Sequence, residues 1–182
     1  MKRPVLIIAA VVVLLILAFV GYRFATTKSH SPSQTVSVDK DDLKVAVTYS
    51  RPYKKGRLIF GDENDKALVP FGQYWRLGAN EATEITFSKE VEFAGTKVPA
   101  GQYRIYAIPG KDQWELRLNS ELGKWGYAEP DYSKDVFKVT VPRETNSEAV
   151  EQFTILLKEQ ADYIEMQLIW DTTLIRVPIK TT

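Results

Sequence analysis

The sequence contains no cysteine and a single histidine, His30. The lack of cysteine excludes disulfide bonds, thiol catalysis, thiolate metal sites and a lipidated N-terminal cysteine. Because His30 lies in a polar segment near the start, no histidine remains for the rest of the chain. A histidine general base, a Ser–His–Asp triad and a histidine metal cluster are therefore excluded from any folded domain beyond it.

A strong excess of charge is also missing, although the charges are unevenly distributed. The net charge is +1, and residues 1–33 carry four basic side chains and no acidic one. The remainder carries 20 basic and 23 acidic side chains. Because a mildly acidic domain repels a phosphate backbone, we expect no nucleic-acid partner.

Helical periodicity is absent beyond residue 40, where apolar and polar residues alternate instead. We predict an all-β domain over residues 39–182, an antiparallel β-sandwich of about nine strands, with a barrel as the alternative. One polar and one apolar face per strand favours the sandwich. Ala94 and Gly95 are expected at a hairpin tip, and residues 145–152 in one helical turn. The clearest expected strands begin at Leu43, Thr83, Gly101, Trp114, Asp135, Gln152, Tyr163 and Leu174.

The chain does have one long apolar run, unbroken from Val5 to Val20. At about 1.5 Å per helical residue, residues 4–25 reach the roughly 30 Å of a bilayer core. We therefore expect residues 1–25 to form a transmembrane signal-anchor helix, with the membrane as the partner of residues 4–25. A cleaved signal peptide is the alternative, but the small-x-small pattern of a cleavage site is missing.

Basic residues flank this run on both sides and marginally favour a cytoplasmic N-terminus. We expect the folded domain outside the cytoplasm, periplasmic or extracellular and anchored to the membrane, with secretion after signal cleavage as the alternative. Residues 26–38 are rich in serine and threonine, a composition that predicts a flexible linker.

Two stretches do not follow the strand pattern, Ser50 to Thr83 and Ser120 to Asp135. Both combine glycine with aromatic and charged residues, and loops carry functional residues more often than strands do. Their motifs SRP, LVPFG, WRLGANEAT and a downstream WG resemble domain-of-unknown-function family 2911. The resemblance covers roughly residues 48–180. It implies an exported or envelope-associated protein without an established activity.

The first irregular stretch contains a group of basic residues, among which Arg51 and Arg57 are candidate ligand contacts. Arginine binds carboxylate or phosphate through two parallel hydrogen bonds. The alternative is an exposed basic turn paired with nearby acidic residues, which has about even odds for these two arginines. For Lys54 and Lys55 the exposed turn is favoured.

The densest cluster is formed by Trp75, Arg76, Asn80 and Glu81. Trp75 is either a core residue, which is favoured, or a platform for a flat ligand such as a sugar ring. The three polar residues either bond one another in a folding corner, which is slightly favoured, or face a ligand.

The second irregular stretch contributes Trp125 and Tyr127. If both stretches lie at the same end of the domain, these two aromatic residues and Trp75 line one cleft. Arg51, Arg76 and Glu81 are then expected at its base. The ligand-binding candidates are Arg51, Arg57, Trp75, Arg76, Asn80, Glu81, Trp125 and Tyr127.

No pattern identifies a catalytic residue, a cofactor or a metal site. Glycoside hydrolysis needs a carboxylate pair, and no spacing singles out a partner for Glu81 among Glu129, Asp131 and Asp135. A phosphate loop and an EF-hand loop are missing. The sequence favours a non-catalytic β-sandwich that binds a glycan, a peptide or a small molecule. A structural or interaction module, and less so a carboxylate-dependent hydrolase, are the alternatives.

Overall fold

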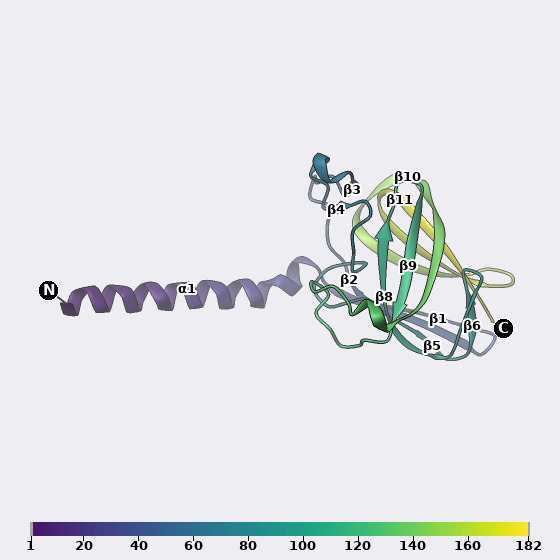
Figure 1. Cartoon of the computed structure of the whole chain (residues 1–182), viewed down its shortest axis with the longest axis horizontal. Helices are drawn as coiled ribbons and strands as arrows, with labels where there is room; N and C mark the ends of the chain where they lie inside the picture. The colour runs from purple at the N-terminus through teal and green to yellow at the C-terminus, as the bar shows by residue number, and fades with distance from the viewer. Residues whose placement is uncertain (1, 182) are drawn as a thin grey trace.

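The structure, a computed structural model, describes residues 2–181 and consists of one helix followed by a β-domain (Figure 1). Within the helix it describes the side chains of residues 7–8, 11–22, 26 and 29–30. The elements are α1 Lys2–His30, β1 Ser33–Lys40, β2 Leu43–Ser50, β3 Phe60–Gly61, η1 Glu63–Asp65, β4 Val69–Pro70, β5 Glu84–Phe87, β6 Val91–Phe93, β7 Thr96–Val98, β8 Gly101–Pro109, β9 Gln113–Asn119, η2 Tyr132–Lys134, β10 Asp135–Glu159 and β11 Ile164–Thr181.

Helix α1 projects away from the domain like a stalk (Figure 1). Among the described residues, no helix is long and apolar enough to cross a membrane, so the predicted transmembrane span is not supported.

The predicted linker is regular structure in most of its length. Helix α1 continues to His30, and β1 begins at Ser33 and pairs antiparallel with β2. In this pairing Val36 lies opposite Val47, and Val38 lies opposite Val45. The alternation of valine with serine and threonine therefore marks an edge strand, whose exposed polar side chains gave it the composition of a linker.

The β-domain is a nine-stranded antiparallel sheet in the order β1-β2-β5-β8-β9-β10-β11-β6-β7, which confirms the all-β prediction. Strands β3 and β4 form a separate short pair. The start of β10 pairs with β9, whereas its second half pairs with β11. Because β10 changes partner along its length, the sheet folds over on itself and encloses a core, as in a sandwich.

Residues 145–152, predicted as a helical turn, lie inside β10. Two register shifts against β11, between Thr145 and Val150 and between Val150 and Thr154, mark bulges in this region. Such bulges bend a strand and disturb its alternation, which is why the sequence pattern broke there. The predicted tip at Ala94 and Gly95 is confirmed: both have positive φ, 45° and 84°, as a tight two-residue hairpin turn requires.

An aromatic cluster fills one end of the core. Trp75 packs against Trp170 with ring centroids 5.8 Å apart, and its ring lies edge-on to Trp114 at 5.6 Å. Phe60 and Phe153 complete the cluster. Tyr49 closes the fold across the core, because its hydroxyl accepts a hydrogen bond from the Ile155 N–H at 2.8 Å.

The outer face of β8 is covered as well. Arg104 and Tyr106, which alternation assigns to the polar face, are 1% and 0% exposed. Residues 120–134 cover them, and Tyr132 contacts the Tyr106 ring. The Tyr106 hydroxyl donates to Asp135 Oδ2 at 2.7 Å, a carboxylate that also accepts from Arg117 at 3.0 Å. This polar network holds the second irregular stretch against the sheet.

Candidate functional site

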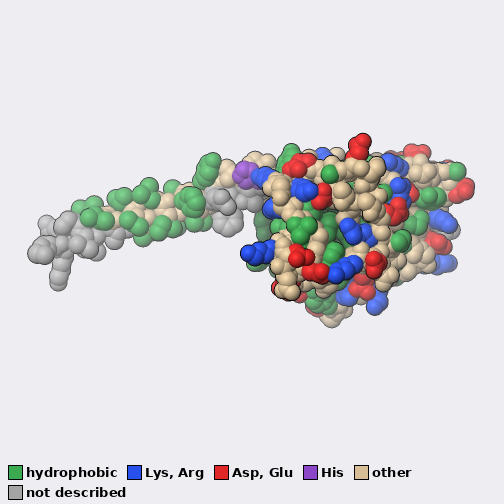
Figure 2. Space-filling model, turned by 90° about the horizontal axis from the view of Figure 1, so that it is seen from above, with side chains coloured by type: hydrophobic (Ala, Val, Ile, Leu, Met, Phe, Trp, Pro, Cys, Tyr) green, Lys and Arg blue, Asp and Glu red, His purple; other side chains and the backbone are tan. Residues whose placement is uncertain are grey.

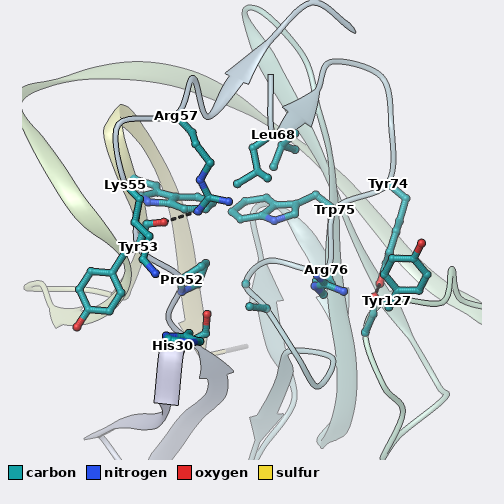
Figure 3. A pocket seen from close by; sticks show the side chains of 16 residues that line it. His30, Pro52, Tyr53, Lys55, Arg57, Leu68, Tyr74, Trp75, Arg76 and Tyr127 are labelled. Carbon is teal, nitrogen blue, oxygen red and sulfur yellow. Dashed lines mark hydrogen bonds between the residues drawn. The ribbon is translucent and has the colours of Figure 1, made fainter. Parts of the chain in front are cut away.

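Parts of the two irregular stretches, residues 52–57, 74–79 and 126–127, converge around one cavity of about 670 Å³. The cavity lies where α1 meets the domain, since His30 and Ser31 also contribute to its wall (Figures 2 and 3). Such a volume suits a small ligand or one end of a larger molecule. The other lining residues are Pro52, Tyr53, Lys55, Arg57, Leu68, Val69, Tyr74, Trp75, Arg76, Gly78, Ala79, Gly126, Tyr127 and Trp170.

A tight turn presents Lys55 and Arg57 to the cavity. The Arg57 N–H bonds the Lys54 carbonyl at 3.1 Å, with positive φ at Lys55 and Gly56. The turn is fixed to β10, because the Lys55 N–H donates to Glu151 Oε1 at 2.8 Å. Lys54 itself is ion-paired with the distant Asp171 at 2.7 Å, and its side chain is 26% exposed. The interpretation favoured for it, an exposed turn paired with nearby acidic residues, is therefore wrong.

The Arg57 guanidinium is oriented by its own turn. Its Nε donates to the Lys54 carbonyl at 2.9 Å, and its Nη2 donates to the Tyr53 carbonyl. Figure 3 shows this side chain reaching across the hollow toward the indole of Trp75. Since a guanidinium has five N–H donors, these two bonds leave Nη1 with both of its hydrogens available.

Trp75 and Arg76 are neighbours with different surroundings. Trp75 exchanges two backbone hydrogen bonds with Ala107, so this segment is extended beside β8. Consecutive side chains in extended backbone point to opposite sides. Trp75 accordingly enters the aromatic core and is 6% exposed, although it also contributes to the cavity wall. The core interpretation favoured for Trp75 therefore accounts for most of its surface.

Arg76 is half-buried in the cavity wall. Its electrostatic neighbours are the hydroxyls of Tyr74 and Tyr127, and no hydrogen bond or ion pair joins it to another described residue. Burial lowers the pKa of the Arg76 guanidinium from its usual value, and no carboxylate of the described residues offsets the loss of water. Arginine nevertheless keeps its charge at every physiological pH.

Gly126 positions Arg76 from the opposite stretch. A β-carbon at position 126 would lie 2.7 Å from Arg76 Cδ and 3.1 Å from the Ala82 backbone, so a larger residue there would force Arg76 and the Ala82 backbone to shift. The Gly126 N–H donates to the Asn80 carbonyl at 2.9 Å, and the Ala82 N–H donates to the Lys124 carbonyl at 3.0 Å. These bonds tie the two irregular stretches together.

The segment between Leu77 and Ala82 is a folding corner. Leu77, Gly78 and Asn80 all have positive φ, and asparagine tolerates this conformation better than most residues. The Asn80 side chain donates to the Ser31 carbonyl at 3.2 Å rather than to its own turn. A β-carbon at Gly78 would lie 2.5 Å from the Ser50 carbonyl oxygen. The space beside Gly78 is therefore occupied by the protein's own backbone.

A buried pair behind the cavity wall was not identified from the sequence. Arg104 donates to the Tyr74 hydroxyl at 2.6 Å and to the Ala128 carbonyl at 2.9 Å. The Tyr74 hydroxyl in turn donates to the Gly126 carbonyl at 2.9 Å. Burial raises the pKa of Tyr74, so this hydroxyl stays protonated and keeps donating. One clue was present in the sequence: Arg104 is a charged residue on an expected strand. No segment had been assigned to cover the polar face of that strand.

Several predicted contacts lie elsewhere. Arg51 bonds the Phe153 carbonyl and the Thr154 hydroxyl, which joins β2 to β10. Glu81 lies in a second cavity of about 340 Å³, pairs its backbone with Trp125 and is separated from Arg76 by the corner. Trp125 is 47% exposed, but it is not among the residues that line the larger cavity. Of the eight candidates, Arg57, Trp75, Arg76 and Tyr127 line this cavity, and Asn80 shapes the corner beside it.

The charge in the cavity wall is of one sign. Among the described lining residues, Lys55, Arg57 and Arg76 are cationic and none is an aspartate or glutamate. Carboxylate-assisted hydrolysis needs two carboxyl groups close to the substrate. The arrangement therefore suits recognition of a ligand and offers no carboxylate for acid–base chemistry from the described wall.

Comparison with known proteins identifies one family. Residues 31–179 match the family described as protein of unknown function (DUF2911), which confirms the resemblance seen in the motifs and extends it to β1. No curated protein and no solved structure matches the chain.

Proposed function

Because the chain belongs to the DUF2911 family, whose function is unknown, we propose from the geometry of the cavity that it is a non-catalytic ligand-binding protein. The observation that carries the proposal is Arg76: a half-buried guanidinium in a cavity wall, bonded to no other described residue. An uncompensated cation is costly to bury, and a ligand group that hydrogen-bonds it removes that cost.

The shape and chemistry of the cavity support the proposal. Its wall combines cationic groups with the rings of Tyr53, Tyr74 and Tyr127, and Tyr127 is 81% exposed. Ligand sites typically pair aromatic surface with a few polar groups that fix orientation. The hydrogen-bonded corner at residues 77–82 and the Tyr74–Arg104 pair hold this wall in place before a ligand arrives, which reduces the entropy cost of binding.

A binding screen with matched variants tests this function. Oligosaccharides, short peptides and small anionic compounds are screened by ligand-observed NMR, and hits are titrated by calorimetry. We expect at least one hit that weakens at least tenfold in Arg76→Ala and is unchanged in Lys138→Ala. Lys138 is an exposed lysine on β10 that lines neither described cavity. The absence of any hit, or equal weakening in both variants, contradicts the proposal.

A second proposal concerns α1, which we propose to associate with a lipid surface. Its described apolar side chains, such as Leu14 and Leu17, are 65% and 61% exposed, and they line the face of the helix that Figure 2 shows. Because residues 11–17 are all apolar and exposed, such side chains occur on every side of the helix. An apolar surface of this kind is normally covered by protein or lipid. The test is flotation of the full chain with phosphatidylcholine vesicles: we expect co-flotation that Leu14→Asp with Leu17→Asp abolishes. Equal flotation of both chains contradicts it, and the predicted location outside the cytoplasm stays a prediction.

A further inference from the structure

Building on the proposed binding function, we infer that the ligand of the larger cavity carries at least two negative charges, as a phosphate group does. The inference starts from the described wall, which places Lys55, Arg57 and Arg76 around one space without an acidic side chain. This concentration of cations is local, because residues 34–182 together carry three more acidic than basic side chains.

The three cations differ from the other basic residues of the site region. Lys54 is paired with Asp171, and Arg51 is bonded to β10. In contrast, the described hydrogen bond of Lys55 uses its backbone N–H, which leaves its ammonium group for a ligand. Two described carboxylates of this region, on Glu151 and Asp171, already accept from the Lys55 backbone and from Lys54.

The donors available for an anion can be counted from these contacts. Arg57 has both hydrogens of Nη1 left, Arg76 has its whole guanidinium, and Lys55 has its ammonium. In Figure 3, Arg57 and Arg76 extend into the hollow from different sides of the Trp75 indole. Two guanidinium groups and one ammonium group therefore surround one space. They match an anion that has several oxygens and more than one negative charge better than they match a single carboxylate.

Arg104 adds to the positive field from behind the wall. It is 1% exposed, it bonds the Tyr74 hydroxyl, and no described carboxylate pairs with it. Its Nε has no described partner. Charges are screened less in a buried setting than in water, so this cation also favours an anion on the cavity side of Tyr74.

The uncharged part of the ligand faces the rings at the cavity rim. Tyr53 and Tyr127 are exposed there, and Leu68 contributes aliphatic surface. Because His30, at the end of the apolar helix, lines the same cavity, the phosphate comes either from a soluble molecule or from a lipid headgroup. Both sources share the chemistry inferred here, and the experiment distinguishes them.

Calorimetric titration of the full chain with pyrophosphate, glycerol phosphate and neutral maltose tests the inference. We expect the phosphates to bind and maltose not to, with affinity falling as salt rises. Arg76→Gln and Lys55→Gln are expected to weaken phosphate binding at least tenfold each, and Arg76→Lys by less. Lys138→Gln removes the same charge outside the cavity and is expected to change the affinity less than twofold. Unfolding midpoints of all variants show whether each is folded.

Vesicle binding provides the second arm. If phosphatidic acid vesicles, whose phosphomonoester headgroup carries up to two negative charges, bind in an Arg76-dependent way and soluble phosphates do not, the anion is a lipid headgroup and the inference stands. If maltose or peptides bind while Arg76→Gln has no effect, the inference of a multiply charged anionic ligand is overturned. The proposed ligand-binding function still stands in that case. If no probe binds, or if Lys138→Gln weakens binding as much as Arg76→Gln, the inference is overturned.

Discussion

Gly126 lies directly against the Arg76 side chain, so that a β-carbon at position 126 would lie 2.7 Å from Arg76 Cδ. This contact joins the two irregular stretches at the cavity wall. The contact explains why a glycine follows Trp125, because a side chain there would collide with Arg76. It also makes the orientation of Arg76 depend on a residue that is far away in sequence.

Gly126→Ala is expected to displace Arg76 and weaken phosphate binding at least tenfold. Overpacking of this kind also costs about 1–3 kcal/mol of unfolding free energy, measured by chemical denaturation. Gly95→Ala is the control, since Gly95 has φ of 84° at a distant hairpin tip and open space around it. It is expected to lose about 1 kcal/mol through strain while binding stays unchanged. Normal binding by Gly126→Ala contradicts the role of the contact.

Tyr74→Phe removes the hydroxyl that bonds both Gly126 and Arg104. Because Arg104 is left with a buried donor unpaired, we expect a loss of about 1–3 kcal/mol in unfolding free energy. Tyr103→Phe is the matched control, because its hydroxyl bonds the Pro99 carbonyl at an exposed position. Denaturation curves that show equal losses for the two variants contradict the buried role of Tyr74.

Trp75→Ala is expected to destabilise the domain by about 3–5 kcal/mol, since it leaves a void among Phe60, Trp114, Phe153 and Trp170. The change is therefore a poor test of binding. Trp125→Ala changes an exposed ring and is expected to alter stability by about 0.5 kcal/mol or less. Urea unfolding distinguishes the two, and a small effect of Trp75→Ala would contradict its placement in the core.

Stability at high pH depends in part on Tyr132. Burial and the hydrogen bond to Glu129 raise the pKa of Tyr132 to about 12, above its unfolded value of about 10. A raised pKa contributes stability that is present in full below pH 10 and is lost as the pH rises through 12. The difference in unfolding free energy between the wild type and Tyr132→Phe should thus be constant up to about pH 9 and shrink above pH 10. A difference that grows over that range contradicts the assignment.

Alternation alone located most of the fold. Val45, Val47 and Tyr49 are buried as predicted, because each strand has one face in a shared core. The same logic failed for β1, whose serine and threonine side chains are exposed at a sheet edge. It also failed for Arg104, because only the tertiary fold shows that residues 120–134 cover the polar face of β8.

Only part of the candidate site could be predicted from the sequence, because the tertiary fold again decides what each side chain faces. The sequence placed Arg76, Asn80 and Glu81 within six residues, which suggested a mutual network. Positive φ at Leu77, Gly78 and Asn80 reverses the chain between them, so Arg76 and Glu81 border different cavities. Backbone reversals of this kind depend on close contacts such as Gly78 with Ser50, which no local pattern reveals.

The most direct measurement is NMR of the arginine Nε–H groups during titration with pyrophosphate. The account predicts saturable shifts at Arg76 and Arg57, whose guanidinium groups line the cavity, and an unchanged signal at Arg51, which is bonded to Phe153 and Thr154. The same titration of Arg76→Gln, followed at the Arg57 signal, is expected to lose saturation in the concentration range used for the wild type. No saturable change at Arg76, or equal shifts at Arg51 and Arg76, would contradict the claim that Arg76 faces a ligand.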